Sequence, residues 1–130
     1  MKDYLEEVSM VVSQADIDTY AELSDDFNPL HVDPEFAART PMGNTIAHGT
    51  LSLNLIWQSL ARSFDAATLA RIDLDVRFLK PLFAGGAIVA GGRRSPEHPD
   101  RFEVWVKGAD GTALIAGHAR LPRLVRAAVN

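Results

Sequence analysis

The sequence predicts an α+β fold in which an antiparallel β-sheet wraps around a long central α-helix. Residues 48–64 are apolar on almost every side, which is typical of a buried helix. From Leu69 onward apolar and polar residues alternate with a period of two, as in strands with one buried and one solvated face. A buried helix followed by strands that short turns connect implies this architecture. With 130 residues, 47% of them hydrophobic, residues 1–130 are expected to form a single domain.

The N-terminal part is expected to form an extended segment and two helices before the long one. Residues 5–12 are expected to be extended, and Ser13 is expected to cap a helix over residues 14–23. The Asn28-Pro29 pair interrupts helical structure, because proline restricts the residue before it. A short helix over residues 33–39 is expected to start at the Asp33-Pro34 pair.

Four strands are expected after the long helix. Turn residues separate them: Lys80-Pro81 and Gly85-Gly86, then SPEHPD at 95–100, then Ala109-Asp110-Gly111 as a hairpin. The predicted strands cover residues 70–78, the segment around 88–92, residues 101–108 and residues 112–121. The tail from Pro122 receives no assignment. A sheet of this size leaves open edges, so pairing with a second copy is expected.

Composition excludes several functions. A net charge of −4 and a pI near 5.5 argue against a nucleic-acid-binding protein. The absence of cysteine excludes disulfides and thiolate metal sites. The N-terminus, MKDYLEEVSM, resembles neither a signal peptide nor a membrane anchor, and the long helix is too short and too often interrupted by polar residues to span a membrane. A soluble, cytoplasmic protein is expected.

The stretch SDDFNPLH, residues 24–31, is the main candidate for a site. Asp26 and His31 lie five residues apart across a proline turn, so both side chains can converge on one point. A carboxylate beside a histidine, whose pKa is normally about 6.5, is a common acid/base arrangement. Spacing alone leaves open that Asp26 is a capping residue and His31 a half-exposed one. Asp25 and Asn28 are typical turn formers, and Asn28 is expected to hold the turn that aims its neighbours.

His48 and Gly49 begin the long helix, where unpaired backbone amides and the helix dipole favour an oxyanion or another anion. Gly49 would let a ligand approach the backbone closely, although it can equally be a permissive helix entry. Asn54 is unfavourable inside a helix and is expected either to meet a partner in the core or to line a cavity. No metal is expected, because His31, His48 and His118 lack the close spacing of a ligand pair.

Three segments resemble the MaoC-like dehydratases, the family of the (R)-specific enoyl-CoA hydratases. The family signature, Gly-Asp-x-Asn-Pro-aliphatic-His with an aromatic residue before it and small residues on both sides, is similar to YAELSDDFNPLHVDPEFA. The matching positions are Tyr20, Ser24, Asp26, Asn28, Pro29, Leu30, His31 and Ala37. A second family element, Ile-x-His-Gly-x-Leu, is matched by Ile46, His48, Gly49 and Leu51, and the segment VRFLKPLFAG also resembles the family.

This resemblance implies a hotdog fold, a homodimer and a lyase of fatty acid metabolism. It implies that Asp26 and His31 hydrate a trans-2-enoyl thioester to the (R)-3-hydroxyacyl thioester, with backbone amides near Gly49 at the thioester oxygen and with Asn28, His48 and Asn54 in positioning roles. No cofactor is expected. Coenzyme A or acyl carrier protein would carry the substrate, and Lys80, Arg93 and Arg94 are assigned to the phosphates of coenzyme A on charge alone.

Two positions depart from the family pattern, and two other functions stay open. Asp25 stands where the family usually has glycine, and Asn54 stands where it often has a serine that helps to hold the catalytic pair. One alternative is a hotdog acyl-CoA thioesterase, which the Asp-x-Asn-Pro-x-His signature disfavours. The other is a non-catalytic protein that binds acyl thioesters.

Overall fold

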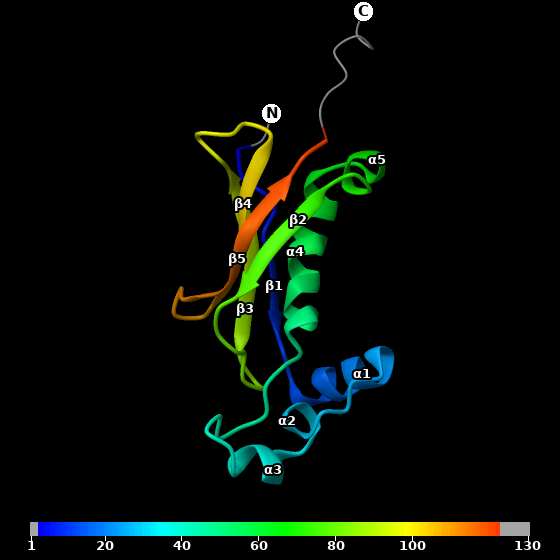
Figure 1. Cartoon of the computed structure of the whole chain (residues 1–130), viewed down its shortest axis with the longest axis vertical. Coiled ribbons are helices and arrows are strands. Elements are labelled where there is room, and N and C mark those ends of the chain that lie inside the picture. Colours follow the sequence, from blue (N-terminus) through cyan, green and yellow to red (C-terminus); the bar gives the residue numbers. More distant parts are fainter. Residues whose placement is uncertain (1–2, 123–130) are drawn as a thin grey trace, which may run out of the picture.

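A computed structural model of the chain describes residues 3–122. Five helices and five strands follow one another in this part of the chain (Figure 1). Their bounds are β1 Val8–Val11, α1 Gln14–Ser24, α2 Pro29–Val32, α3 Pro34–Ala38, α4 Gly49–Ser63, α5 Ala66–Leu69, β2 Asp73–Phe78, β3 Ala87–Arg94, β4 Arg101–Gly108 and β5 Ala113–Arg120.

The strands form one antiparallel sheet with the order β1-β3-β4-β5-β2. The long helix α4 lies along one face of this sheet, and α1, α2 and α3 gather beyond its N-terminal end (Figure 1). The predicted α+β arrangement is therefore confirmed, including the four strands after the long helix. The tail from Pro122 has no sequence-based assignment, and its residues 123–130 lie outside the described part.

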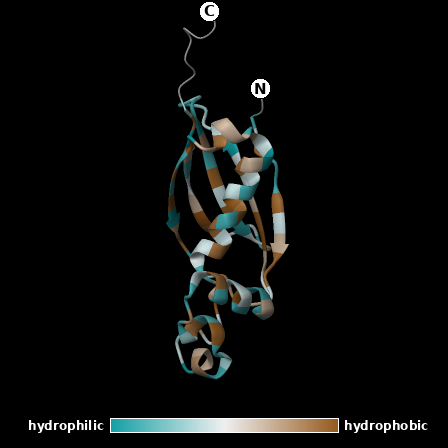
Figure 2. Cartoon of the chain, turned by 90° about the vertical axis from the view of Figure 1, so that its right-hand side faces the viewer, coloured by the Kyte–Doolittle hydropathy of each residue, from teal (hydrophilic) through white to brown (hydrophobic). Residues whose placement is uncertain are grey.

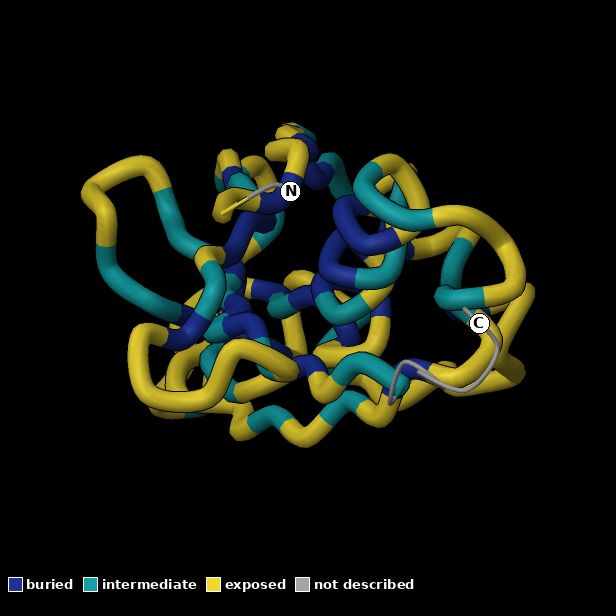
Figure 3. Tube along the Cα trace, turned by 90° about the horizontal axis from the view of Figure 1, so that it is seen from above, coloured by how far each residue is buried: buried dark blue, intermediate teal, exposed yellow. Residues whose placement is uncertain are grey.

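The hydrophobic core lies between α4 and the sheet. On the helix it consists of Leu51, Leu55, Ile56 and Leu60, and on the central strands of Ile88, Ala90, Phe102, Val104, Val106, Ile115 and Ala119. In Figure 2 hydrophobic and hydrophilic residues are interspersed along α4 and the strands, and Figure 3 marks the buried residues along the chain.

The prediction that α4 is buried on nearly all sides is wrong for the single chain. Thr50, Asn54, Gln58 and Arg62 are exposed, because the sheet covers only one side of the helix. Within residues 3–122, no helix combines the length and the apolar character needed to cross a bilayer.

Serines on α4 connect the helix to the extended segment that leads into β1. The hydroxyl of Ser59, which is fully buried, donates to the Glu6 carbonyl. Ser63 Oγ accepts the Glu6 N–H at 2.9 Å and donates to the Ser59 carbonyl at 2.8 Å. These bonds satisfy polar groups at the helix surface that would otherwise be costly to bury.

The N-terminal helices begin where capping residues allow. Ser13 and Asp16 form the reciprocal bonds of a capping box at the start of α1, which confirms the predicted cap. Asn28 and Asp33 cap α2 and α3, each of which has proline in its first turn. The sequence predicts the second of these short helices but not the first, because the Asn28-Pro29 pair indicates an interruption of helical structure. Helix α5 was also not predicted.

Strand β2 is an edge of the sheet, and its burial differs from the prediction. Its apolar residues point toward the helix side as expected, but Leu74 and Val76 are only half-buried and Phe78 is 55% exposed. An edge strand has a neighbour on one side only. Phe78 also lies level with the first residue of α4, since its ring faces Gly49, so little of the helix remains to cover it.

We predict that Gly117→Ala destabilises the fold by roughly 1–3 kcal/mol, the usual cost of overpacking. A Cβ atom on Gly117 would lie 2.0 Å from the Asp75 carbonyl oxygen and 2.6 Å from the Val76 Cα, so strand β2 would have to move. Urea unfolding measures the change in the free energy of unfolding.

Gly108→Ala is the matched control, because the nearest atom to its added Cβ is a side-chain oxygen of Asp110 at 3.5 Å. Equal stabilities for the two variants would contradict the close approach of β5 and β2 at Gly117.

Candidate active site

A left-handed residue opens the turn that carries Asp26. Asp25 ends α1 with φ 56° and ψ 35°, the conformation that helix ends most often give to glycine and that aspartate and asparagine also accept. This explains in physical terms why glycine is usual at this position in the family pattern. Asp25 is an exposed capping residue, as its turn-forming character predicted.

The turn then folds back so that Asp26 and His31 meet. Asp26 Oδ1 accepts the Asn28 N–H at 3.2 Å, and Asn28 Oδ1 accepts the Leu30 N–H at 3.0 Å. Asn28 therefore holds the turn, as expected. The single turn of α2 brings His31 Nε2 to 4.0 Å from Asp26 Oδ2, which is close but longer than a direct hydrogen bond.

A backbone carbonyl sets the orientation of His31. Nδ1 of His31 lies 2.8 Å from the Ile46 carbonyl oxygen, so this nitrogen carries the proton and donates it. In the neutral ring Nε2 then has a free lone pair, facing the Asp26 carboxylate. The side chain of His31 is 13% exposed and that of Asp26 is 52% exposed. Two hydrogen-bond acceptors thus flank one position that solvent can reach.

His48 supports this pair from the buried side. It is 3% exposed, and its Nε2–H donates to the Asp26 backbone carbonyl at 2.9 Å. Its ring stacks on His31 with centroids 3.9 Å apart and planes 25° apart, and Tyr20 meets its other side edge-on at 5.0 Å. Tyr20 Oη donates to Thr50 Oγ1 at 2.7 Å. The second sequence motif therefore packs directly on the first.

The N-terminus of α4 opens beside His31. His48 is its N-cap but makes no side-chain bond to the first turn, so the N–H groups there depend on other partners. The ring of Phe78 packs against Gly49, where an added Cβ would lie 2.8 Å from a ring carbon. Glycine at this position thus has a packing role in addition to the backbone access that the sequence suggested.

A cavity of about 360 Å³ adjoins these groups. His31, Gly49 and Ser52 supply its polar part, and Lys80 lies on its wall. The remaining lining is apolar: Ile46, Ala47, Phe78, Leu79, Pro81, Leu82, Leu114 and Ile115. An apolar pocket with a few convergent polar groups is the usual form of a small-molecule site.

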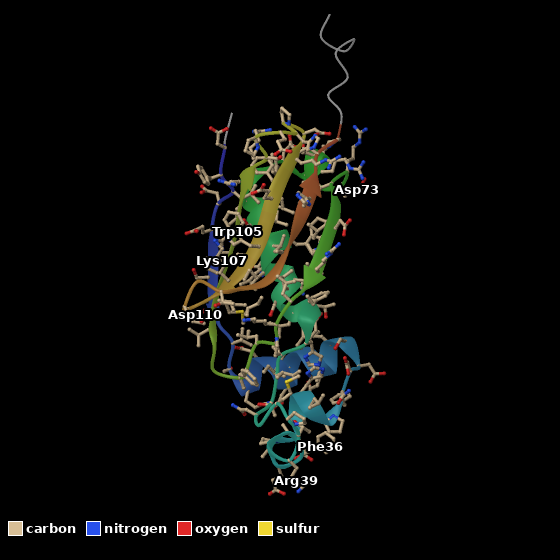
Figure 4. All side chains as sticks on the ribbon, turned by 60° about the vertical axis from the view of Figure 1, so that its left-hand side comes forward. Phe36, Arg39, Asp73, Trp105, Lys107 and Asp110 are labelled. Atoms are coloured by element: carbon tan, nitrogen blue, oxygen red, sulfur yellow. The ribbon has the colours of Figure 1, made fainter. Side chains whose placement is uncertain are left out.

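Larger grooves lie on the face of the sheet that is turned away from α4. One of about 490 Å³ surrounds Trp105, whose ring carries the Lys107 ammonium at 4.3 Å from its centroid (Figure 4). Another, of about 420 Å³, lies over β1, the start of β3 and the end of β4. Neither is lined by His31 or Gly49, which both line the smaller cavity, so the smaller cavity is the candidate site.

The structure places three other predicted residues away from this cavity. Asn54 is exposed on α4 and lines a shallow groove with Tyr20, Leu23 and Gln58. Asparagine fits this helix because the position faces solvent, and not because it has a partner in the core.

Arg93 and Arg94 are the last two residues of β3. Arg94 lies seven residues from Ala87, the first residue of the strand, which is about 23 Å at the usual rise of a strand. Asp73 shares their end of the sheet and lies far from Phe36 of α3 in Figure 4. Arg93 pairs with Glu103 at 3.0 Å, and Arg94 lies over the Phe102 ring. Of the three cations assigned to coenzyme A, only Lys80 lines the cavity of its own chain.

Asp26, His31 and His48 also form a possible cation site, with one ligand atom from each within 4.8 Å of the others. Sequence spacing did not predict this group, because His48 reaches it only through the fold. The stacked rings are unfavourable for chelation. Ligand lone pairs lie in the ring planes, and two nearly parallel planes 3.9 Å apart do not converge on one ion at about 2.1 Å from each nitrogen. His118 is exposed on β5 and does not join the group.

Sequence reasoning missed Gln14, Ser52 and Phe78. Ser52 and Phe78 line the cavity, and Gln14 donates to the His31 carbonyl. Ser52 had a weak signal, since it is a small polar residue three positions after Gly49 on an apolar helix. Gln14 had none, because its contact spans 17 residues.

Curated proteins that this chain resembles are named as hydratases or dehydratases of acyl thioesters. The (R)-specific enoyl-CoA hydratase of Aeromonas caviae is 36% identical over 76 residues, which are 58% of this chain and 57% of that protein. The 3-hydroxybutyryl-CoA dehydratase of Methylorubrum extorquens is 34% identical over 77 residues, which are 59% of this chain and 49% of that protein. The chain thus spans about half the length of the curated relatives it matches.

Solved structures agree with the fold. An (R)-hydratase from A. caviae involved in PHA biosynthesis superposes with a TM-score of 0.78 at 26% identity, covering 94% of this chain and 98% of that one. An R-hydratase from Pseudomonas aeruginosa reaches a TM-score of 0.79 at 24% identity, covering 93% and 80%. These likenesses confirm the hotdog fold. The model of the MaoC-like domain matches residues 1–107, and the chain belongs to the MaoC-like dehydratase family.

Proposed function

We propose that the protein reversibly hydrates trans-2-enoyl thioesters to (R)-3-hydroxyacyl thioesters. The observation that carries this proposal is the pair of acceptors, Asp26 Oδ2 and the free Nε2 of His31, 4.0 Å apart beside an apolar cavity. A water between them can donate one hydrogen to each, which leaves its oxygen lone pair free to attack. The names of the relatives, an (R)-specific enoyl-CoA hydratase and a 3-hydroxybutyryl-CoA dehydratase, support this choice of reaction.

In the hydration direction the water oxygen bonds to C3 of the enoyl group. One water proton passes to the Asp26–His31 pair, and the electrons of the C2–C3 double bond move toward the thioester oxygen to give an enolate. The pair then returns a proton to C2, so the net change is the addition of one water molecule. General acid–base catalysis of this kind contributes about 10²- to 10⁴-fold.

The developing enolate needs a positive environment. The first turn of α4 at Gly49 supplies backbone N–H groups and the positive end of the helix dipole, and it adjoins the cavity that His31 lines. The proposed thioester oxygen lies against this helix end. Asn28 and His48 would act through the positions of His31 and Asp26, whereas the exposed position of Asn54 gives no support to the positioning role assigned to it.

The thioester is proposed to be carried by coenzyme A or by acyl carrier protein, as in fatty acid metabolism in the cytoplasm. Among residues 3–122, Lys80, on the cavity wall, is the cation best placed for a phosphate or for the pantetheine arm. Addition of water needs no net oxidation or reduction, so the proposed reaction requires no redox cofactor.

A homodimer is part of the proposal. Strand β2 is an open sheet edge, and Phe78 and the adjacent Leu79 are 55% and 52% exposed. Open edges with apolar neighbours favour pairing between chains.

The first prediction from the proposed function is that the protein consumes crotonyl-CoA with loss of the enoyl absorbance and without release of free thiol. Two measurements decide the reaction class: absorbance of the enoyl thioester and a thiol-reactive dye. Thiol release would instead indicate a thioesterase, and binding without either signal would indicate a non-catalytic acyl-thioester protein. Both results would reject the proposed hydration.

The second prediction concerns the pair itself. Asp26→Asn and His31→Ala should each lower kcat by roughly 10²- to 10⁴-fold, because each removes one of the two groups that handle the water proton. Steady-state kinetics with the best enoyl-CoA substrate measures the loss, and circular dichroism checks the fold.

Asp25→Asn is the matched control for the aspartate. It makes the same change of charge one residue away, at an exposed position whose left-handed conformation asparagine accepts. It should keep kcat within a few-fold. If Asp26→Asn and Asp25→Asn had similar activity, the assignment of Asp26 would be wrong.

A further inference from the structure

The side chain of Gln14 connects three segments that meet beside His31. Its Nε2 donates to the His31 carbonyl at 2.8 Å and to Asp18 Oδ1 at 2.9 Å. Its Oε1 accepts the hydroxyl of Thr45, a residue that is 1% exposed. Gln14 thus uses both ends of its amide, on partners that lie 17 and 31 residues away in the sequence.

Two of these partners, His31 and Thr45, belong to the two segments that fix the position of the His31 side chain. The Ile46 N–H donates to the Leu30 carbonyl at 3.0 Å, and the Ile46 carbonyl accepts the His31 Nδ1 proton. Gln14 donates to His31, which follows Leu30, and accepts from Thr45, which precedes Ile46. It therefore closes the link between the His31 turn and the segment that orients the imidazole.

The chemical requirement at this position is narrow. The side chain must donate to a carbonyl and accept from a hydroxyl at the same time, at the length of glutamine. An ionised carboxylate cannot donate, an ammonium cannot accept, and a shorter amide would not span the same distance. Asp18, one turn further along α1, accepts from the same Nε2 and so fixes which end of the amide faces His31.

A purely local role in starting the helix does not account for these bonds. Ser13 and Asp16 already form the capping box of α1, and Gln14 is not part of it. Every bond of its amide, apart from the one to Asp18, leaves helix α1.

We propose that Gln14 is a positioning residue for the reaction: its amide holds the His31 turn against the Thr45–Ile46 segment, so that Nδ1 stays bonded to Ile46 and Nε2 faces Asp26. This proposal rests on the proposed function, since Gln14 acts through His31. It assigns a role in catalysis to a residue outside both sequence motifs.

The test compares Gln14→Glu with Gln14→Ala. In the glutamate variant an ionised carboxylate would face the His31 carbonyl and could not donate, whereas the protonated carboxyl can replace the amide. Asp18 and the His31 carbonyl both favour the protonated form. Near neutral pH its kcat should be roughly 10- to 100-fold below that of the native protein. The ratio of the two kcat values should rise toward one as the pH falls.

The alanine variant should show a similar loss whose ratio does not change with pH, and KM should change less than kcat in both variants. Gln58→Glu is the matched control, because it introduces the same carboxylate at an exposed position of α4 and should keep native kcat at every pH. If the alanine variant does not fold, Gln14→Met, which keeps the length of the side chain, takes its place.

A second measurement separates this proposal from the proposed function. Nitrogen-15 NMR of the histidine rings should show His31 as the Nδ1–H tautomer in the native protein and a shifted or mixed tautomer in Gln14→Ala. The exposed His98 and His118 should not change. If the native protein hydrates no enoyl thioester but the His31 signals move, the proposed function fails while the link from Gln14 to His31 holds. Unchanged His31 signals together with native kcat in both Gln14 variants would overturn the proposal.

Discussion

The hydrogen bond from His31 Nδ1 to the Ile46 carbonyl is the interaction on which the rest of the candidate site depends. It decides which ring nitrogen carries the proton, and so which nitrogen is free to face Asp26. It also joins two parts of the chain that the sequence keeps 15 residues apart. Because the segment after Ile46 leads directly into α4, the same bond fixes His31 relative to the amides at Gly49. The bond from His48 to the Asp26 carbonyl and the stacking of His48 on His31 hold the same groups beside the helix N-terminus.

The sheet supports this bond through the position of α4. The helix packs one apolar side on the central strands, and the serines at its far end are bonded to the Glu6 backbone. The loop before the helix is bonded to the segment between β2 and β3, where Ala47 donates to the Leu82 carbonyl and Ala84 donates to the Thr45 carbonyl. A rigid core therefore holds the helix N-terminus, while the Asp26 turn lies at the surface where substrate and water can reach it. Buried packing and exposed chemistry meet at one short segment.

Periodicity and capping chemistry predicted most of the fold, because both act within a few residues. They identified α1, α4 and the four later strands, whereas the spacing of Asp26 and His31 showed only that their side chains could converge. Features that depend on the third dimension were not predictable in this way. Asn54 was expected to meet a partner in the core or to line a cavity, because asparagine is unfavourable inside a helix, and it lies in a surface groove because the sheet covers only one side of α4. Arg93 and Arg94 have the positive charge that a phosphate site needs, but they lie at the end of β3 and do not line the cavity of their own chain. Gln14 left no local pattern, since its bonds reach other segments.

The left-handed backbone at Asp25 has a consequence for the charge beside Asp26. Glycine, asparagine and aspartate all accept this conformation, so the position can be neutral or negative without any change in the path of the chain. Asp25 therefore works as an adjustable charge beside Asp26, separate from the geometry of the turn. A negative residue there weakens the attraction of any anionic carrier at low ionic strength, and salt screens that effect beyond about 10 Å at 0.1 M. The encounter with substrate can in this way be tuned independently of the chemical step.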